Sequence, residues 1–467
     1  MNSILKNILP LGLSICLLCS CLATKDYSRP ETYAVEQYRT QRISHDTSSW
    51  AEYHWEDIFR DSYLKQYITE ALQANLDLLK AQQNLLISAS LAKQSKSLMA
   101  PTVTGGFTPA YIWPSTETFL GDSYPNDSHY SDISLGLSLA WEADVWGRLT
   151  SLKKAAAAQY LASENMQRLI KSRVVGTITS NYYLLLSLDA KEAFLKDAIK
   201  NREEGLTTVR SLKESGSLSE VAVIQNESLL NIAQTMLIDV QREIKLRENI
   251  LSVLIGRTPE KLPRNSWEAQ KIIPPLGLGI PMDLLNNRPD IMSAEYELVR
   301  AFQLTNVANA SFYPKISIQA SGGLNSQNFD NLFSVNALFG NLIGNLTQPI
   351  FNQRRLRTQK EVSVARQQTA YLNYKQTVLE AYREVSDALY TYDAGAAKMT
   401  IQSHQNQQLR LAVKYSETLQ DQGMASYLEV LAAKNNSLDI QLDIIDTKLS
   451  MMLSAVDLYL ALGGGWK

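Results

Sequence analysis

Residues 133–145 have the sequence ISLGLSLAWEADV, and every odd position, from Ile133 to Val145, carries an apolar side chain. The positions between them hold serine, glycine, alanine or acidic residues. Successive side chains of a β-strand point to opposite faces, so this alternation predicts a strand with one apolar face. The apolar face of such a sheet needs a covering environment, which is either a protein core or lipid.

Apolar alternation also follows two prolines that end helical stretches, Pro101 and Pro314, because the residue before a proline avoids the helical region. In the last such stretch Leu338, Leu342, Leu346 and Ile350 share one face. We therefore predict four strands in two pairs, at residues 102–113, 131–146, 315–325 and 337–351.

Two very long segments without proline follow the predicted strand pairs. They run from Leu149 to about Leu212 and from Leu356 to about Gln420. At 1.5 Å per residue, each would span about 95 Å as an unbroken helix. The last helix repeats apolar residues at alternating spacings of four and three, as in a coiled-coil seam. These residues are Leu438, Leu442, Ile445, Leu449, Met452, Val456 and Tyr459. An amphipathic core helix would show a similar pattern, so length is the stronger indication.

The second half of the chain repeats the first, which indicates duplication. Asp77 and Pro101 precede Asp290 and Pro314 by the same number of positions. A connector rich in proline separates the halves, and proline there favours an extended path. We divide the chain into a signal peptide (1–20), a lipidated N-terminal segment (21–60), a first repeat (61–258), the proline-rich connector (259–285) and a second repeat (286–467).

The N-terminus has the features of a secretory signal. Lys6 supplies a positive charge, and the apolar run Ile8–Leu18 is too short for a membrane helix of about 20 residues. All three cysteines, Cys16, Cys19 and Cys21, lie here. The stretch before Cys21 resembles a bacterial lipobox, which implies that this cysteine is acylated and becomes the mature N-terminus. An ordinary signal peptide that contains cysteine is the alternative.

The mature chain has no run of about 18 apolar residues after Cys21, so any membrane crossing must use strands closed into a barrel. Open sheet edges would leave backbone groups unpaired in lipid. Four strands cannot close a barrel, since known single-chain barrels start at about eight strands. Several copies would therefore share one barrel. A soluble four-stranded sheet packed on a protein core is the alternative.

Composition and motifs give no candidate for catalysis. The formal net charge of −2 offers no argument for nucleic-acid binding. The four histidines lack metal-ligand spacing, and no nucleotide-binding loop or nucleophile elbow occurs. The run Gly463–Gly465 follows a helix and predicts a helix stop with a flexible tail. We expect no enzyme activity, no cofactor and no metal site.

Several short motifs follow one another in a characteristic order. They begin with Cys21 followed by Tyr27–Pro30, and continue with Trp55, Phe59, Asp61 and Leu64, then Asn75–Leu78, Trp141–Leu149, Asn287–Ile291, Phe312–Pro314, Gln348–Phe351 and Leu458–Trp466. Together they cover nearly the whole mature chain. Their order and spacing resemble those of the TolC-type outer-membrane factors. The resemblance is to the NodT- and OprM-like lipoprotein branch, which serves resistance–nodulation–division (RND) efflux pumps.

This resemblance implies a mainly α fold with transmembrane β structure, built from two tandem repeats that each hold long coiled-coil helices and a strand pair. It implies a homotrimer with a twelve-stranded β-barrel in the outer membrane and a twelve-helix α-barrel in the periplasm. The implied function is the exit duct of a tripartite efflux system, which passively conducts small molecules or ions. The implied partners are a periplasmic adaptor, an inner-membrane RND pump and outer-membrane lipid. N-acyl and diacylglycerol groups on Cys21 would anchor the chain.

The resemblance also suggests a gate at the periplasmic ends of the helices, where acidic rings are common. The helix turns should lie at Gly216 and Gly423, and Glu429 stands at the position of the family's acid. Its counterpart in the first half is Ala222, and Ala432 replaces a second acid of some relatives. The predicted ring is therefore less acidic than the family pattern. A solvated helix face is the alternative role for Glu429.

Two other functions stay open. A lipid-anchored periplasmic coiled-coil adaptor or structural protein would keep the lipid and the helices but would make the strands soluble. A type I protein-secretion duct would share the whole architecture. A lipid-anchored cell-wall enzyme is disfavoured, because no acid–base pair or metal cluster stands out.

Overall fold

The computed structural model describes residues 24–31, 50–115, 117, 129–273 and 283–467. The chain divides into two compact units. The first unit consists of residues 1–31, 86–162 and 294–374, and the second of residues 32–85, 163–293 and 375–467. Each unit therefore combines a part of the first half of the chain with a part of the second half.

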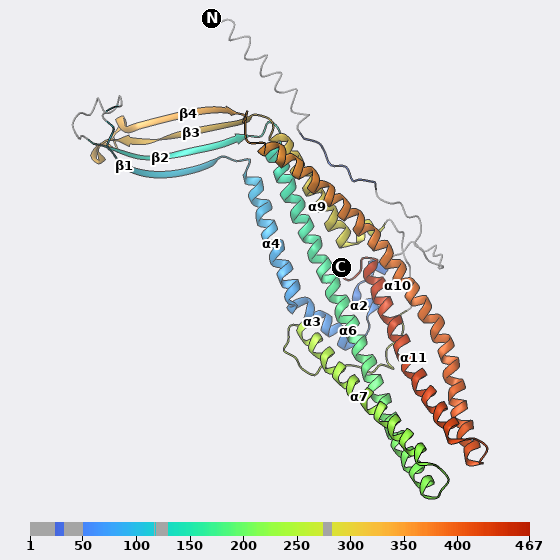
Figure 1. Ribbon diagram of the computed structural model, residues 1–467. Helices are drawn as coiled ribbons and strands as arrows, with labels where there is room; N and C mark the ends of the chain where they lie inside the picture. The colour runs from blue at the N-terminus through green and yellow to red at the C-terminus, as the bar shows by residue number, and fades with distance from the viewer. Residues whose placement is uncertain (1–23, 32–49, 116, 118–128, 274–282) are drawn as a thin grey trace. The chain divides into compact units, whose positions relative to one another are not determined.

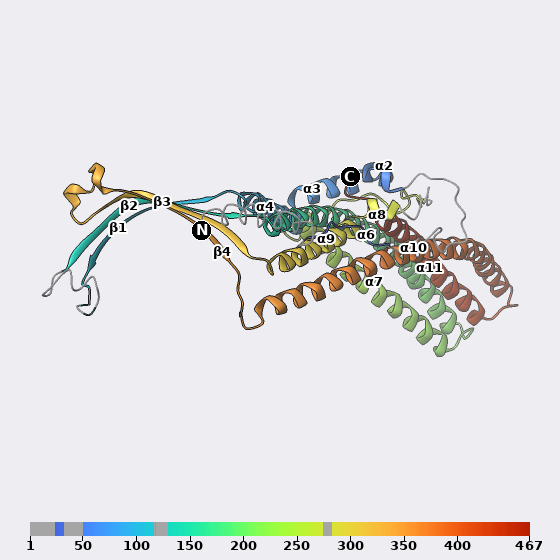
Figure 2. The same cartoon turned by 90° about the horizontal axis from the view of Figure 1, so that it is seen from above.

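The first unit contains one antiparallel sheet of four strands in the order β1-β2-β3-β4. The strands are β1 (Thr102–Ile112), β2 (Tyr130–Ala143), β3 (Lys315–Ser326) and β4 (Leu338–Thr347). Figures 1 and 2 show the four strands side by side. The two strand pairs come from different halves of the chain and meet where β2 pairs with β3.

Two strands end earlier than the sequence predicts. β2 stops at Ala143 because the side chain of Asp144 accepts hydrogen bonds from the backbone N–H groups of Leu149 and Thr150, at 2.8 and 2.7 Å. This acceptor satisfies free donors at the start of the next helix. β4 stops at Thr347, just before Pro349, whose missing N–H cannot join a strand ladder.

The strand pairing gathers the apolar side chains on one face of the sheet. One cross-strand row consists of Val103, Leu139, Ala320 and Leu342. The next row points to the opposite face and consists of Thr104, Ser138, Ser321 and Asn341. Directly paired residues share a face, so the alternation predicted for residues 133–145 and for 316–320 is confirmed within β2 and β3. In β4 it holds for Leu338, Leu342 and Leu346, whereas Phe339 and Ile343 lie on the face of Asn341 and Ile350 lies beyond the strand.

The long helices occur in matched pairs, one from each half of the chain. Helices α4 (Leu76–Ser97) and α9 (Pro289–Ala310) have 22 residues each and lead to the strand pairs. Helices α6 (Arg148–Glu214) and α10 (Arg355–Asp421) have 67 residues each and follow the strand pairs. Helices α7 (Glu220–Leu254) and α11 (Tyr427–Ala461) have 35 residues each. Equal lengths in both halves confirm the tandem repeat.

Shorter elements complete the fold. They are η2 (Trp50–Glu52), α2 (Trp55–Ile58), α3 (Ser62–Ala74) and α8 (Leu284–Asn287), with η4 (Phe329–Asn331) and η5 (Val335–Ala337) between β3 and β4.

Tyr459 of α11 lies in the core of the second unit. Its ring meets Trp50 and Phe59 edge-on, with centroids 6.4 and 5.7 Å away, and its hydroxyl donates to the Tyr53 carbonyl at 3.0 Å.

The coiled-coil seam predicted for the last helix faces the interior. Leu438, Leu449, Met452, Val456 and Tyr459 are buried. The remaining seam residues, Leu442 and Ile445, are half-buried. Among the helices in the described residues, none combines the length and the apolar character that a membrane crossing needs.

The prediction of a flexible C-terminal tail is wrong. The hydroxyl of Ser172 donates to the Gly464 carbonyl at 2.5 Å, and Lys171 donates to the Trp466 carbonyl at 3.0 Å. The indole N–H of Trp466 donates to the Asn287 carbonyl at 3.1 Å. The tail is therefore fixed by partners that lie far away in sequence, which a local glycine pattern does not reveal.

Candidate functional site

The apolar face of the sheet is exposed in the single chain. Leu342 is 76% exposed and Leu346 is 70% exposed, and large apolar residues of β1 and β2 are exposed as well, whereas the apolar residues of β3 are half-buried. β1 and β4 are the edge strands of this sheet, and each pairs with only one strand within the described residues. An exposed apolar patch of this kind marks a surface that another molecule or lipid covers.

The two helix pairs of the second unit turn at the predicted glycines. Gly216, between α6 and α7, has φ +77°, and Gly423, between α10 and α11, has φ +73°. Both lie in the left-handed region that residues with a side chain rarely adopt. The N–H groups of Ser217 and Met424 bond back to Leu212 and Leu419, closing each helix end. The predicted turn positions therefore coincide with those in the structure.

Glu429 lies in the first turn of α11 and is exposed. Its carboxylate accepts a hydrogen bond from the Ser426 backbone N–H at 3.2 Å, and the Ser426 side chain accepts one from the Glu429 backbone. This reciprocal arrangement is a capping box, which stabilises the start of a helix. The structure thus gives Glu429 a capping role that the sequence analysis did not foresee.

Two polar contacts tie α11 to the α6–α7 pair near these turns. The hydroxyl of Tyr427 donates to the side-chain oxygen of Asn226 at 2.5 Å, and burial raises the pKa of Tyr427. Arg202 donates to the Leu229 carbonyl and, at 2.9 Å, to the side chain of Asn435. A cavity of about 560 Å³ lies beside these contacts. The second helix pair is therefore held to the first by side chains and not by packing alone.

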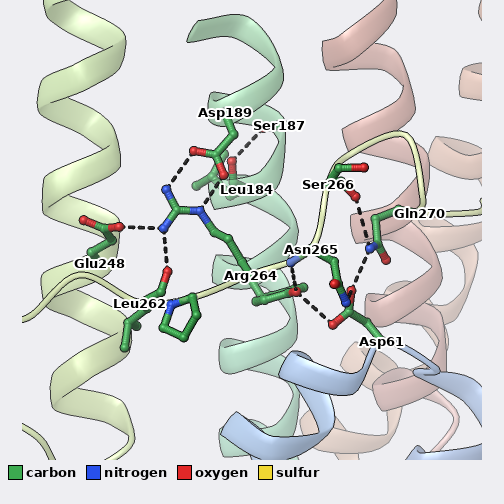
Figure 3. Close-up of polar contacts among 12 residues, drawn as sticks. Asp61, Leu184, Ser187, Asp189, Glu248, Leu262, Arg264, Asn265, Ser266 and Gln270 are labelled. Atoms are coloured by element: carbon green, nitrogen blue, oxygen red, sulfur yellow. Dashed lines mark hydrogen bonds and ion pairs between the residues drawn. The ribbon is translucent and has the colours of Figure 1, made fainter. Parts of the chain in front are cut away.

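Arg264, from the proline-rich connector, joins two long helices (Figure 3). Its guanidinium donates to Asp189 of α6 at 2.5 and 2.7 Å and to Glu248 of α7 at 2.5 Å. Burial alone would lower the pKa of Arg264, but the hydrogen bonds and charges of both carboxylates raise it above its ordinary value. The connector therefore fixes the spacing of α6 and α7.

Asp61 forms a second polar centre next to the connector, as Figure 3 shows. It caps α3 by accepting from the N–H groups of Tyr63 and Leu64 at 3.0 and 3.1 Å. It also accepts from the Tyr182 hydroxyl at 2.8 Å, and from Asn265 and Gln270 of the connector. One carboxylate thus orders the start of α3, the middle of α6 and the connector.

In the second half of the chain, Arg288 also joins several helices. It is buried and donates to Asp290 at 3.0 and 2.6 Å and to the Ala461 carbonyl at 2.9 Å, and it pairs with Glu384 of α10 at 2.8 Å. Burial would lower the pKa of Arg288, and the bond to Asp290 with the charge of Glu384 raises it overall. Arg288 therefore joins α9, α10 and α11.

These polar contacts were not predicted from the sequence, although Arg288 and Asp61 are among the motif residues that carry the resemblance. Tyr427, Asn226, Arg202 and Arg264 carry no local pattern, because their partners lie tens or hundreds of positions away. Cys21, the predicted lipid attachment site, lies outside the described residues. Within the described residues, no group of three or more histidine, cysteine or acidic side chains is placed to hold a metal ion.

A sheet with one exposed apolar face, joined to paired helices of 67 and 35 residues, defines a class of protein: a channel whose strands face lipid and whose helices continue outside it. The chain belongs to the outer membrane efflux protein family, which matches it over residues 67–257 and 280–464. It is therefore an outer membrane efflux channel.

Individual relatives agree with this assignment. The chain is 30% identical to the solvent efflux pump outer membrane protein SrpC of Pseudomonas putida, over 97% of each chain. It is 25% identical to the probable outer membrane lipoprotein SilC of Salmonella typhimurium, also over 97% of each. Its fold is similar to that of the Neisseria gonorrhoeae MtrE outer membrane channel, with a TM-score of 0.85, 24% identity, and coverage of 95% of this chain and 98% of MtrE.

Proposed function

We propose that three copies of this chain form the exit duct of a tripartite efflux system. The main support is the four-stranded sheet, which exposes an apolar face and has two edge strands. Lipid would cover the apolar face, and β1 and β4 of neighbouring copies would pair, so that twelve strands close one barrel. Closure satisfies the edge groups that lipid cannot. The face with serine, threonine and asparagine would then line the water-filled lumen.

The long helices would continue the duct through the periplasm. A periplasmic adaptor and an inner-membrane RND pump would complete the system, and the pump would supply the energy. The duct itself would do no chemistry and would hold no cofactor. The relative SrpC is named for solvent efflux, which favours small molecules as the cargo of this chain.

We further propose that Cys21 carries N-acyl and diacylglycerol groups. Support comes from the lipobox-like sequence and from the similarity to SilC, which is named as a probable lipoprotein. Two or three acyl chains anchor a protein stably in a membrane. Mass spectrometry of the mature N-terminal peptide tests this modification directly.

The turns at Gly216 and Gly423 would form the periplasmic gate, and three copies of Glu429 would place negative charge on its axis. Charged rings favour counter-ions in pores. Substitution Glu429→Gln removes the charge but keeps an oxygen that can accept from Ser426, so it separates selectivity from helix capping. We expect the variant to lose cation preference in reversal-potential measurements while its thermal unfolding midpoint stays unchanged. Unchanged cation preference would assign Glu429 to capping alone.

The duct is tested by reconstitution of the full-length protein in planar lipid bilayers. We expect discrete conductance steps, and a species of three subunits on gels run without heating. A lipid-anchored adaptor or structural protein would give no conductance, and that result would overturn the proposal. Conductance together with export of a polypeptide, but of no small molecule, would instead favour a type I secretion duct.

A further inference from the structure

The face of the sheet that would line the lumen is not polar throughout. Phe339 and Ile343 of β4 lie on the same face as Asn341, because side chains two positions apart on a strand point the same way. Phe339 is 41% exposed and Ile343 is 43% exposed in the single chain. Two large apolar side chains therefore face the space through which cargo would pass, and both are open to solvent.

The row of the sheet that holds Phe339 has glycine on the other three strands. Phe339 pairs with Gly323 of β3, which pairs with Gly136 of β2. Gly136 in turn pairs with Gly106 of β1. A Cβ atom on Gly106 would meet nothing within 4 Å, so open space lies above the backbone there. The ring of Phe339 therefore stands beside a strip of bare backbone, here called the glycine row.

Polar side chains border the glycine row on the same face. The row on one side consists of Thr104, Ser138, Ser321 and Asn341. The row on the other side carries Thr108, Ser134 and Asn325 on the first three strands. Thr104 and Ser138 share a hydrogen bond of 2.6 Å between their hydroxyl groups, as neighbours on paired strands commonly do. Phe339 is therefore an aromatic ring in an otherwise polar part of the wall.

An aromatic ring exposed in a water-filled lumen favours apolar solutes. Contact between the ring and an apolar group removes water from both surfaces, which is favourable. Two aromatic rings gain further from offset-stacked or edge-to-face contact. A solute that stays fully hydrated makes no such contact. Ile343 offers a second apolar surface four positions along β4, at about 14 Å.

We propose that Phe339 and the glycine row form a contact site for the apolar part of uncharged cargo, with Ile343 as the next apolar contact along the path. The inference rests on the proposed duct function and specifies the chemical class of its cargo. Solutes that carry an aromatic ring pause at Phe339 on their way through the barrel. The glycine row leaves room for such a ring, because it holds no side chain that would compete for the same space.

Two glucosides test this contact in the full-length protein reconstituted in planar lipid bilayers. Phenyl glucoside carries an aromatic ring, whereas methyl glucoside carries the same sugar with a methyl group. Both are uncharged and soluble in water, so a difference between them reports on the ring. We expect phenyl glucoside to interrupt the open-channel current for roughly fivefold longer than methyl glucoside, the equivalent of one aromatic contact. Equal interruptions by the two glucosides would overturn the inference.

Substitutions at position 339 assign the contact to the aromatic ring. Phe339→Ser removes the ring, so we expect the two glucosides to interrupt the current equally. Phe339→Tyr keeps the ring and should keep the fivefold difference. Asn341→Ser is the matched control, since it alters a polar side chain on the same face of the same strand and should also keep the difference. A fivefold difference that persists in Phe339→Ser would overturn the inference.

A purely structural role of Phe339 is tested in parallel, because an aromatic side chain can stabilise a sheet by covering a glycine on the neighbouring strand. We expect every variant to give the same fraction of heat-stable oligomer in purified outer membranes. If Phe339→Ser does not assemble, Phe339→Leu takes its place, since leucine fills the position without an aromatic ring. Phe339→Leu should then shorten the interruptions by phenyl glucoside, and unchanged interruptions would overturn the inference.

The same recordings separate this inference from the proposed function. Absence of conductance in the unmodified protein would count against the duct itself. Conductance in the unmodified protein without a preference for phenyl glucoside would count against the inference alone and would leave the duct intact.

Discussion

Arg264 shows how much a single buried residue can matter in a fold of long, thin helices. Its guanidinium lies between the carboxylates of Asp189 and Glu248, and its side chain is only 11% exposed. The connector holds no helix in this region, so side-chain contacts of this kind fix its path between α6 and α7. Removal of Arg264 would leave two facing carboxylates without their shared cation.

We predict that Arg264→Ala lowers the free energy of unfolding by about 3 kcal/mol, as expected when one partner of a buried ion pair is lost. The matched control is Arg242→Ala, which removes an exposed pairing with Asp239 and should cost less than about 1 kcal/mol. Denaturant titration followed by circular dichroism measures both. Similar losses for the two variants would contradict the role assigned to the connector.

Tyr67 gives a prediction on the pH dependence of stability. Burial raises its pKa to about 12, and its hydroxyl donates to the Pro263 carbonyl at 2.5 Å. Since the unfolded tyrosine titrates near 10, the stabilising contribution is fully present below about pH 10 and is lost as pH rises towards about 12. Tyr67→Phe should therefore cost about 1 kcal/mol at neutral pH and show a smaller loss of stability above pH 10. The exposed Tyr415→Phe serves as the control. Identical alkaline unfolding curves for all three proteins would contradict this prediction.

At the scale of elements, a row of glycines crosses the sheet at one level. Gly106 pairs with Gly136, and Gly136 pairs with Gly323. A Cβ on Gly323 would lie 2.2 Å from the Leu135 carbonyl oxygen, and a Cβ on Gly136 would lie 2.9 Å from the Gly322 carbonyl oxygen. The backbones of β2 and β3 approach too closely there for any side chain, as at a deliberate bend in a sheet.

We predict that Gly323→Ala sharply reduces the yield of the folded sheet, because backbone atoms would have to move to make room for the methyl group. Gly106→Ala is the matched control, since a Cβ there meets nothing within 4 Å. Resistance to protease in isolated membranes reports on the folded sheet. If both alanine variants resist protease as well as the unmodified protein, the glycines have no role in the bend.

At the scale of the whole molecule, the two faces of the sheet differ in polarity, and this difference indicates the environment of each face. Leu342 and Asn341 are neighbours on β4, yet they lie on opposite faces. The apolar face is exposed on β1, β2 and β4 in the single chain. In the proposed barrel, lipid would cover this face and the strands of neighbouring copies would complete the edges.

We predict that Leu342→Arg makes the free energy of assembly in the membrane less favourable by about 2–4 kcal/mol. This is the range found for a cation on the lipid-facing side of a strand near the middle of the bilayer. Asn341→Arg carries the same charge and size on the opposite face and should assemble normally. The fraction of heat-stable oligomer in purified outer membranes compares the two. Equal defects in both variants would contradict the assignment of lipid and lumen faces.

Local patterns in the sequence were enough to predict the four strands, the long helices and their order along the chain. The patterns that predicted these elements are local. They are the alternating stretch at 133–145, the prolines Pro101 and Pro314, and the long segments without proline. Each pattern acts on residues that are close together in sequence. A period of two indicates a strand, and very long segments without proline, such as those of α6 and α10, indicate long helices. The duplication followed from Asp77 and Pro101, which precede Asp290 and Pro314 by the same number of positions. The turns at Gly216 and Gly423 were expected from the resemblance to the family.

Only the tertiary structure decided which residues hold these elements together. Arg264, Asp61, Tyr427 and Arg29 all bind partners from distant parts of the chain, and such pairs leave no periodic signal. The fixed C-terminal tail escaped for the same reason, because its partners lie far away in sequence. The capping role of Glu429 was missed although Ser426 and Glu429 form a local Ser-x-x-Glu pattern. A sequence pattern fixes which face of an element is apolar, whereas specific polar contacts depend on distances that arise only when the whole chain has folded.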